Sequence, residues 1–409
     1  MYLQFLLFWF IGLSSASNEL LQVHVVYRHG ARAPVQEFLS AESADHFYRG
    51  IGSLSDTGVK QSNKLGEVLR NRYVNSSFLD SRLIPEEILF RSSAADRVLM
   101  SAAIVGQAMF LVPPAIHSTP LEEDLLLYDK NIHCPVVLKE MVKTYNIPSN
   151  YTDRYKERKI NGVIDAILAR VMSNSTKLNA ERMEHIDTLL VEKNEGLAVP
   201  SWFDDVAERE TQMAFFHAIN LLGGSGPYHS VKWIRINAGQ LFHEINSLMR
   251  QKIACFKKND TEECSNLRKF YTYGTHDIKI AGFLDIMGAM EAALGVGGFP
   301  EPGSSVIFEL WMIDDKPKIK MLGRRHNEMD DYSVLTYSIQ GCDPYSDFCD
   351  ANIMLENFKE YETSDPSEEC NGSHTDFSTN ILTWIFLGTT VLLLILLTSL
   401  IIILIRCSR

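Results

Sequence analysis

A seven-residue segment near the N-terminus combines the residue types needed to bind and attack a phosphoryl group. It consists of Arg28, His29, Gly30, Ala31, Arg32, Ala33 and Pro34. Two guanidinium groups beside one imidazole supply fixed positive charge and forked hydrogen-bond donors for phosphate oxygens. Neighbouring cations also favour the neutral imidazole, whose ring nitrogen is then a nucleophile. The segment therefore predicts a phosphate site with His29 as the attacking group, and a solvated surface turn is the simpler alternative.

The residues before this segment predict a buried strand that ends at it. Residues 21–27 read LQVHVVY, a short run rich in β-branched side chains, and a stretch containing Gly and Pro follows. Ligands of open α/β sheets bind outside the carboxyl ends of the strands. This position favours the phosphate site over the surface turn. His24 lies inside the strand, and we interpret it as a core histidine without chemistry.

Two later segments repeat the arrangement of a strand followed by polar side chains. A short strand at 87–90 precedes Arg91, and a strand at 269–274 precedes His276 and Asp277. A His-Asp pair alone usually forms a loop salt bridge or a helix cap, and an arginine at the start of a helix can simply pair with Asp96. The position of these residues after predicted strands favours a role in chemistry.

The alternation of strands and helices predicts an α/β fold. Helices are expected at 55–73, 94–110 and 238–249 and from Ile278, and further strands at 306–313 and 318–322. Residues 121–230 are helical and dense in charge, with few strand signals. We therefore predict a central mixed, mostly parallel sheet with helices on both faces in residues 18–120 and 231–357, and an inserted helical cap domain at 121–230.

The pattern Arg-His-Gly-x-Arg-x-Pro resembles the signature of the histidine acid phosphatases, a branch of the phosphoglycerate mutase-like superfamily. The resemblance extends over most of the predicted luminal chain. Its further blocks contain Gly52, Leu54, Gly58, Gln61, Leu65, Gly66, Arg72 and Tyr73, then Arg91, Ser92, Asp96, Arg97 and Ser101, then Pro200 and Trp202, and finally residues 273–277.

The resemblance implies a role for each site residue. His29 would form a phosphohistidine, Asp277 would protonate the leaving oxygen, and the phosphate would be bound by Arg28, Arg32, Arg91 and His276. Positioned cations suit the charge spread over transferring phosphoryl oxygens, so neither a metal nor another cofactor is expected. A general acid must be protonated, and an unperturbed Asp has a pKa of about 3.9. We therefore expect an acidic optimum. The resemblance also implies a homodimer.

Three residues depart from the family pattern. Ser55 stands where Thr is common, and Ile278 and Lys279 follow the His-Asp pair where small polar residues are common. We expect Lys279 at the rim of the pocket, where it would alter substrate preference.

Both ends of the chain carry apolar segments. Residues 1–13 are apolar and 14–17 are small, which predicts a signal peptide at 1–17. Residues 381–405 carry no charge, are long enough to cross a hydrocarbon core of about 30 Å, and precede Arg406. We expect a single-pass type I membrane protein with a luminal or extracellular catalytic domain, in the lysosome or endosome or at the cell surface. A stalk at 358–380, a transmembrane helix at 381–405 and a cytoplasmic tail at 406–409 complete this topology.

Cysteines and sequons agree with an oxidising compartment. Six of the seven cysteines precede the apolar segment and allow 15 pairings. Short separations favour Cys255–Cys264 and Cys342–Cys349, which leaves Cys134–Cys370. The candidate glycosylation sites are Asn75, Asn150, Asn174, Asn259 and Asn371.

Composition removes some functional classes and leaves others. The chain has 409 residues, 46% of them hydrophobic, and a formal net charge of -12, which argues against nucleic acid as a partner. His243 and Glu244 lack the second histidine of a zinc protease motif. The remaining alternatives to an acid phosphatase are a phytase or lysophospholipid phosphatase on the same scaffold, and a non-catalytic, membrane-anchored binding or adhesion ectodomain. The intact set of site residues argues against the last.

Overall fold

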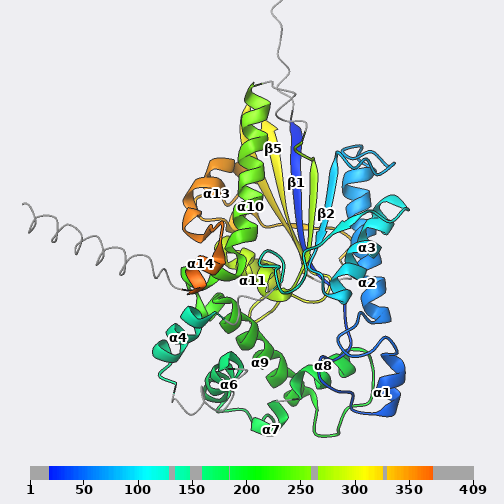
Figure 1. The fold of residues 1–409 in the computed structure, drawn as a ribbon, viewed down its shortest axis with the longest axis vertical. Coiled ribbons are helices and arrows are strands. Elements are labelled where there is room, and N and C mark those ends of the chain that lie inside the picture. The colour runs from blue at the N-terminus through cyan, green and yellow to red at the C-terminus, as the bar shows by residue number, and fades with distance from the viewer. Residues whose placement is uncertain are drawn as a thin grey trace, which may run out of the picture.

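The computed structural model describes residues 18–128, 134–147, 159–183, 185–258, 266–325 and 329–371. Figure 1 shows one sheet with helices along both of its faces and a further group of helices beyond one end of the strands. The predicted signal peptide (1–17), transmembrane helix (381–405) and cytoplasmic tail (406–409) lie outside the described residues, as do Asn150 and Asn259. Within the described ranges, every helix is too short or too polar to cross a bilayer.

Among the described residues, the sheet has eight strands in the order β3-β2-β4-β1-β5-β6-β7, with β8 also paired to β6. The parallel half contains β1 (Glu19–Arg28), β2 (Ile88–Ser92), β3 (Ile116–His117) and β4 (Phe270–Thr275). The antiparallel half contains β5 (Ser305–Ile313), β6 (Lys316–Arg324), β7 (Ser333–Val334) and β8 (Cys349–Asp350).

The expected mixed sheet is therefore present, but the expectation that it is mostly parallel is wrong, because the pairings β1–β5, β5–β6, β6–β7 and β6–β8 are antiparallel. The turn between β5 and β6 consists of Asp314 and Asp315, both with positive φ (50° and 59°). Two such residues make the hairpin turn whose twist matches that of the strands, and a connection this short joins only antiparallel neighbours.

Helices cover both faces of the sheet. One face carries α2 (Asp56–Leu69), η1 (Arg70–Val74) and α3 (Asp96–Phe110), and the other carries α10 (Val231–Lys258), α11 (Asp277–Ile286) and α13 (Ala351–Asn357). Alternate residues of β1 serve the two cores, since Val25 and Tyr27 pack with α2 and α3 while Val26 packs with α10 and α11. His24 is fully buried, bonded to Gln22 and stacked on a tyrosine, as a core histidine should be.

The remaining helices lie in two places. Those beyond the end of the sheet are α1 (Ala41–His46), α4 (Pro135–Thr144), α6 (Lys159–Val171), α7 (Ala180–Met183), α8 (Ile186–Asn194) and α9 (Asp205–Gly223). The short ones elsewhere are η3 (Gly226–Tyr228), α12 (Met290–Leu294), η4 (Thr336–Ser338), η5 (Lys359–Tyr361) and α14 (Pro366–Asn371). Helices α4 to α9 fall within 121–230, which we call the cap, and α9 packs directly on α11.

The prediction of a stalk beginning at residue 358 is wrong for its described part, because residues 358–371 pack against α10. Glu362 is mostly buried and accepts hydrogen bonds from Arg250 (2.7 Å) and Asn246 (2.8 Å). Glu369 pairs with Arg235 at 2.6 Å. The acidic composition that suggested a solvated stalk instead matches basic and amide side chains on one helix.

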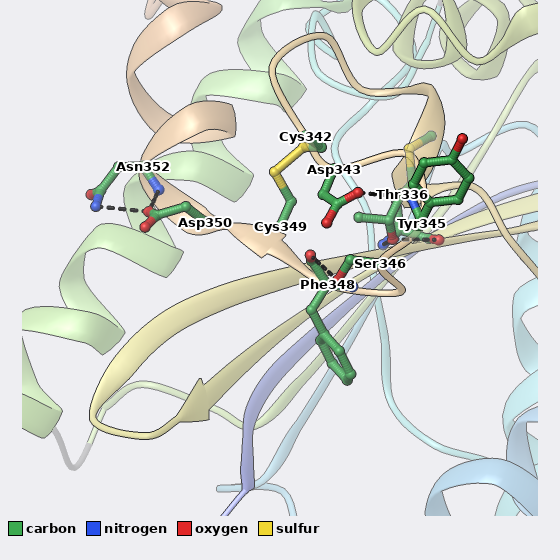
Figure 2. The surroundings of a disulfide bond; sticks show 10 residues. Thr336, Cys342, Asp343, Tyr345, Ser346, Phe348, Cys349, Asp350 and Asn352 are labelled. Atoms are coloured by element: carbon green, nitrogen blue, oxygen red, sulfur yellow. Dashed lines mark hydrogen bonds between the residues drawn. A yellow bond between two sulfur atoms is a disulfide. The ribbon is translucent and has the colours of Figure 1, made fainter.

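Two of the three predicted disulfides are confirmed. Cys134 is bonded to Cys370, which ties the first cap helix to the last described helix, and Cys342 is bonded to Cys349. Figure 2 shows the second bond closing a short loop beside β8. Cys255 is also disulfide-bonded, and its predicted partner Cys264 lies outside the described residues. The sequon residues Asn75 and Asn174 are exposed.

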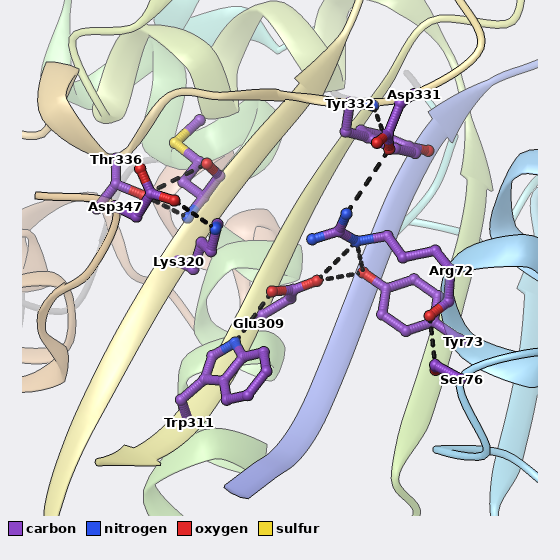
Figure 3. A network of polar contacts seen from close by, with 11 residues as sticks. Arg72, Tyr73, Ser76, Glu309, Trp311, Lys320, Asp331, Tyr332, Thr336 and Asp347 are labelled. Atoms are coloured by element: carbon purple, nitrogen blue, oxygen red, sulfur yellow. Dashed lines mark hydrogen bonds and ion pairs between the residues drawn. The ribbon is translucent and has the colours of Figure 1, made fainter. Parts of the chain in front are cut away.

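A buried carboxylate fastens the end of α2 to the sheet. Glu309 of β5 is 1% exposed and accepts hydrogen bonds from the hydroxyl of Tyr73 (2.7 Å), Nε of Arg72 (2.9 Å) and the indole of Trp311 (3.0 Å). Figure 3 shows these side chains converging on it. Arg72 and Tyr73 both belong to the π-helical turn η1, which directly follows α2. A buried charge needs this degree of hydrogen bonding to be tolerated.

Removing one of these hydrogen bonds should lower the stability of the protein. Tyr73→Phe leaves the Glu309 carboxylate with one donor fewer, so the free energy of unfolding should fall by about 1.5 to 3 kcal/mol. Urea unfolding followed by tryptophan fluorescence measures this change. The matched control is Tyr345→Phe, whose ring is 97% exposed and which should be nearly neutral. Equal stability of the two variants would contradict the prediction.

Candidate active site

The segments predicted to carry chemistry meet at the carboxyl edge of the parallel strands. Arg28 at the end of β1 is in register with Thr275 at the end of β4, and the backbone N–H of His29 donates to the Thr275 carbonyl at 3.3 Å. Ser93, which follows β2, donates its backbone N–H to the carbonyl of Gly274 at 3.0 Å. The loops after three neighbouring strands are thus held against one another by main-chain hydrogen bonds.

His29 is buried, and its two ring nitrogens have different partners. Nδ1 donates to the carbonyl of Gly30 at 2.7 Å, an assignment that follows because a carbonyl oxygen only accepts. Nε2 consequently carries the lone pair, and it accepts a hydrogen bond from Nε of Arg97 at 3.1 Å. The nitrogen that is free to attack therefore faces a guanidinium group, which is where a phosphate would bind.

The loop around His29 is held by close backbone packing. A Cβ on Gly30 would lie 2.3 Å from the carbonyl oxygen of Gly58, so only glycine fits here. The backbone N–H of Gly30 donates to Oγ of Ser101 at 3.1 Å, and that of Ala31 donates to the side chain of Gln61 at 2.7 Å. Helices α2 and α3 thereby fix the loop from two sides.

Arg28, His276 and Asp277 join His29 at the same edge. Nη2 of Arg28 lies 2.8 Å from a carboxylate oxygen of Asp277, and Nη1 donates to the carbonyl of Pro300 at 2.7 Å. Within the described chain, nothing accepts from the buried Nε of Arg28, so this donor is available to a phosphate oxygen. The ring of His276 is 5.6 Å from that of His29 and lies 3.3 Å from the hydroxyl of Ser93.

Arg32 reaches this region from the other side of the loop and is held by the cap. Its guanidinium forms two hydrogen bonds with the carboxylate of Asp187 on α8, at 2.8 and 3.1 Å. The charge of Arg32 still acts on Arg28, on Arg97 and on His276. The structure therefore places Arg32 at the site, but with a partner that the sequence did not indicate.

The structure does not bring Arg91 to this group, and the prediction that it binds the phosphate is wrong. Arg91 lies within β2 rather than in the loop after it. Its neighbour Phe90 faces α2 and α3, so the side chain of Arg91 projects from the other face of the sheet, toward α10. There it pairs with Glu244 at 3.0 Å. Arg97, on the first turn of α3, takes the place beside His29. The helix start after a strand is the usual anion site of a βα unit, and that signal identifies Arg97.

Lys279 is not at the rim, contrary to expectation. It is 1% exposed, and its ammonium group donates to the carbonyl of Asn237 and, at 3.5 Å, to that of Leu125. Those carbonyls belong to α10 and to the loop that carries Tyr128, whose ring lies 5.5 Å from that of His276. Lys279 therefore connects two segments behind the site. Ser55 caps α2 by accepting from the backbone N–H of Gly58.

The environment keeps both histidines uncharged. Burial lowers the pKa of His29 well below its ordinary value of about 6.5, and the charges of Arg28 and Arg97 lower it further. Burial, Arg97 and Arg28 likewise lower the pKa of His276. A histidine is neutral at any pH above its pKa, so His29 keeps its lone pair in mildly acidic solution where an ordinary histidine is protonated.

Known proteins with similar sequences are phosphatases. Residues 19–324 match the profile of the histidine phosphatase superfamily (branch 2). Putative acid phosphatase 1 of Caenorhabditis briggsae is 34% identical over 401 residues, covering 96% of this chain and 93% of that protein. Lysosomal acid phosphatase of Xenopus laevis is 29% identical over 350 residues, with coverage of 80% and 73%. Prostatic acid phosphatase of Homo sapiens is 26% identical over 361 residues, with coverage of 83% and 86%.

Solved structures share the fold. The apo phytase of Hafnia alvei superposes with a TM-score of 0.58 at 14% identity, covering 87% of this chain and 98% of that one. The phytase of Citrobacter braakii gives a TM-score of 0.57 at 14% identity, with coverage of 86% and 99%.

The assignment of Arg97, rather than Arg91, to the phosphate site is testable with inorganic phosphate. Arg97→Ala should weaken phosphate binding on the order of 10- to 100-fold, because it removes a charged donor from the anion position. Arg91→Ala is the matched control and should change the dissociation constant by less than about threefold, since it breaks only a partly exposed ion pair away from His29. Isothermal titration calorimetry measures both. A larger loss from Arg91→Ala would return that residue to the site.

Proposed function

The chain belongs to the histidine phosphatase superfamily (branch 2) and is an acid phosphatase, and from this premise we propose that it hydrolyses phosphate monoesters through a phosphohistidine on His29. The observation that carries the proposal is the hydrogen bonding of the His29 ring. Nδ1 donates to a carbonyl while Nε2 points its lone pair at Arg97. Nε2 is thus fixed as the nucleophile, and Nδ1 keeps the ring proton.

In the first step, Nε2 of His29 attacks the phosphorus atom as the bond from phosphorus to the ester oxygen breaks. Arg28, Arg97 and Arg32 stabilise the charge on the phosphoryl oxygens, and Asp277 gives its proton to the departing oxygen. The phosphorylated ring is then positively charged and keeps its Nδ1–H. The Gly30 carbonyl at 2.7 Å accepts from that N–H and stabilises the charged ring.

In the second step, a water molecule attacks the phosphorus atom and the bond to Nε2 breaks. The Asp277 carboxylate takes a proton from the water, which restores the acid for the next cycle. Neutral His29 and inorganic phosphate are the products. His276 faces His29 edge-on and donates a hydrogen bond to a phosphoryl oxygen, a role that fits its uncharged ring.

Asp277 shares Arg28 with the substrate in this scheme. Its carboxylate lies 2.8 Å from the guanidinium and its side chain is 21% exposed, so it borders the solvent side of the site. An incoming phosphate competes for the same guanidinium. That competition would turn Asp277 from Arg28 toward the leaving oxygen.

Removing the acid should affect substrates according to their leaving groups. Asp277→Asn should lower kcat/KM for an alkyl phosphate such as 2-glycerophosphate by about 10²- to 10⁴-fold. The loss with 4-nitrophenyl phosphate should be much smaller, because nitrophenolate departs without a proton. Steady-state assays with the two substrates measure both losses.

His29→Ala is the companion variant and should abolish turnover of both substrates. It removes the proposed nucleophile rather than the acid, so it should show no dependence on the leaving group. Turnover by His29→Ala comparable with the unchanged protein would overturn the covalent mechanism.

We also propose a membrane-anchored topology. Disulfides, together with lysosomal and prostatic acid phosphatases among the relatives, indicate the secretory pathway or the outside of the cell. The sequence supports a cleaved signal at 1–17 and a type I anchor at 381–405. A homodimer is a further proposal, based on family resemblance alone.

The anchor can be tested with two forms of the chain expressed in the same cells. The full chain should stay with membranes during alkaline carbonate extraction, because a helix of this hydrophobicity partitions into the bilayer. A chain ending at residue 371 should be released into the medium with its phosphatase activity. Release of the full chain by carbonate would contradict the proposed anchor.

A further inference from the structure

The cap supplies a carboxylate to one of the phosphate-site arginines. Asp187 on α8 receives two hydrogen bonds from Arg32, at 2.8 and 3.1 Å, in the paired geometry that suits a guanidinium and a carboxylate. Its Oδ2 also accepts from the backbone N–H of Val35 at 3.0 Å. Both charged side chains are 15% exposed, so water screens this pair only weakly.

Two more carboxylates anchor the cap segment that carries Asp187. Further along the cap, Glu192 is fully buried and accepts from the backbone N–H of Leu39 (2.9 Å) and the hydroxyl of Ser43 (2.6 Å). Glu195 then accepts from the hydroxyls of Ser55 (2.6 Å) and Thr57 (2.7 Å). Three carboxylates within residues 187–195 thus bind the segment 32–57, which contains Arg32. The ion pair therefore belongs to a fixed contact between the cap and the signature loop.

Carboxylates lie among the arginines of the site. The arginines are Arg28, Arg32 and Arg97, and the carboxylates whose charge acts on Arg28 are Asp277, Asp187 and Glu301. A single phosphate dianion gains from such a site, because the arginines point donors at it from short range. A substrate with several phosphates brings much more negative charge, and at longer range its additional phosphates meet the fixed carboxylate of Asp187.

We propose that Asp187 is a specificity-determining residue, which limits the site to one phosphate group by neutralising Arg32 and by repelling additional phosphates. This inference rests on the proposed phosphatase function and adds the reason why a scaffold shared with phytases would prefer simple monoesters. The alternative is that Asp187 only orients Arg32 for phosphate binding. The two roles differ in outcome, since loss of orientation weakens every phosphate ligand while loss of charge favours the polyanion.

The test compares a monoester with a polyanion on the same protein. Asp187→Asn preserves shape and an acceptor for Val35 while removing the charge. The readouts are kcat/KM for 4-nitrophenyl phosphate and the inhibition constant of inositol hexakisphosphate against it. We expect the hexakisphosphate to bind more tightly on the order of tenfold, with kcat/KM for the monoester changing by less than about threefold.

Two control variants separate local charge from general effects. Asp205→Asn removes a charge from an 89% exposed position on α9, and it should leave both readouts unchanged. Asp187→Glu keeps the charge and should stay close to the unchanged protein in selectivity. If Asp187→Asn does not fold, Glu301→Gln removes another carboxylate that acts on Arg28 and should shift the same ratio in the same direction.

An unchanged or equally weakened response to both ligands would overturn the proposal and leave Asp187 as an orienting residue. Failure of the unchanged protein to hydrolyse 4-nitrophenyl phosphate at all would instead overturn the proposed function. The inhibition constant is measurable whether or not the hexakisphosphate is itself hydrolysed.

Discussion

The hydrogen bond from Nδ1 of His29 to the Gly30 carbonyl constrains the rest of the site. It assigns the ring proton to one nitrogen and leaves the lone pair on Nε2, toward Arg97. It depends on a loop so tight that Gly30 and Gly58 touch through their backbones, and therefore on the packing of α2 against that loop. The buried ties at the far end of α2, through Tyr73 and Glu309, hold that helix to the sheet.

Burial and positive charge act together on the nucleophile. An imidazole placed among guanidinium groups in water would still be partly protonated in acid, because solvent screens the charges. Here the ring is withdrawn from solvent, so burial and the neighbouring arginines both lower its pKa. An enzyme that works in acid needs this combination, since its nucleophile must stay neutral while its general acid stays protonated. The sheet edge provides it by bringing three loops over one ring.

The cap contributes charge as well as shape. Asp187 pairs with Arg32, and the neighbouring glutamates fix the segment that carries it. The same acidic character appears near the C-terminus, where Glu362 and Glu369 meet basic residues of α10. In the cap and near the C-terminus alike, an acidic segment therefore forms a contact with a distant part of the chain. Composition alone does not distinguish such a contact from a solvated stalk, because the partners are more than a hundred residues away in sequence.

The sequence by itself determined the α/β fold class and the phosphatase reaction, and it predicted most of the residues that meet at the sheet edge. The strand at 21–27, the signature at 28–34 and the pair at 276–277 predict a phosphate site because strand ends meet at one sheet edge. The choice between Arg91 and Arg97, the burial of Lys279 and the partner of Arg32 were decided only by the tertiary structure. Each depends on which sheet face a side chain occupies or on a contact between distant segments. Local sequence patterns fix the order of helices and strands, whereas tertiary packing decides which side chains meet in the buried site.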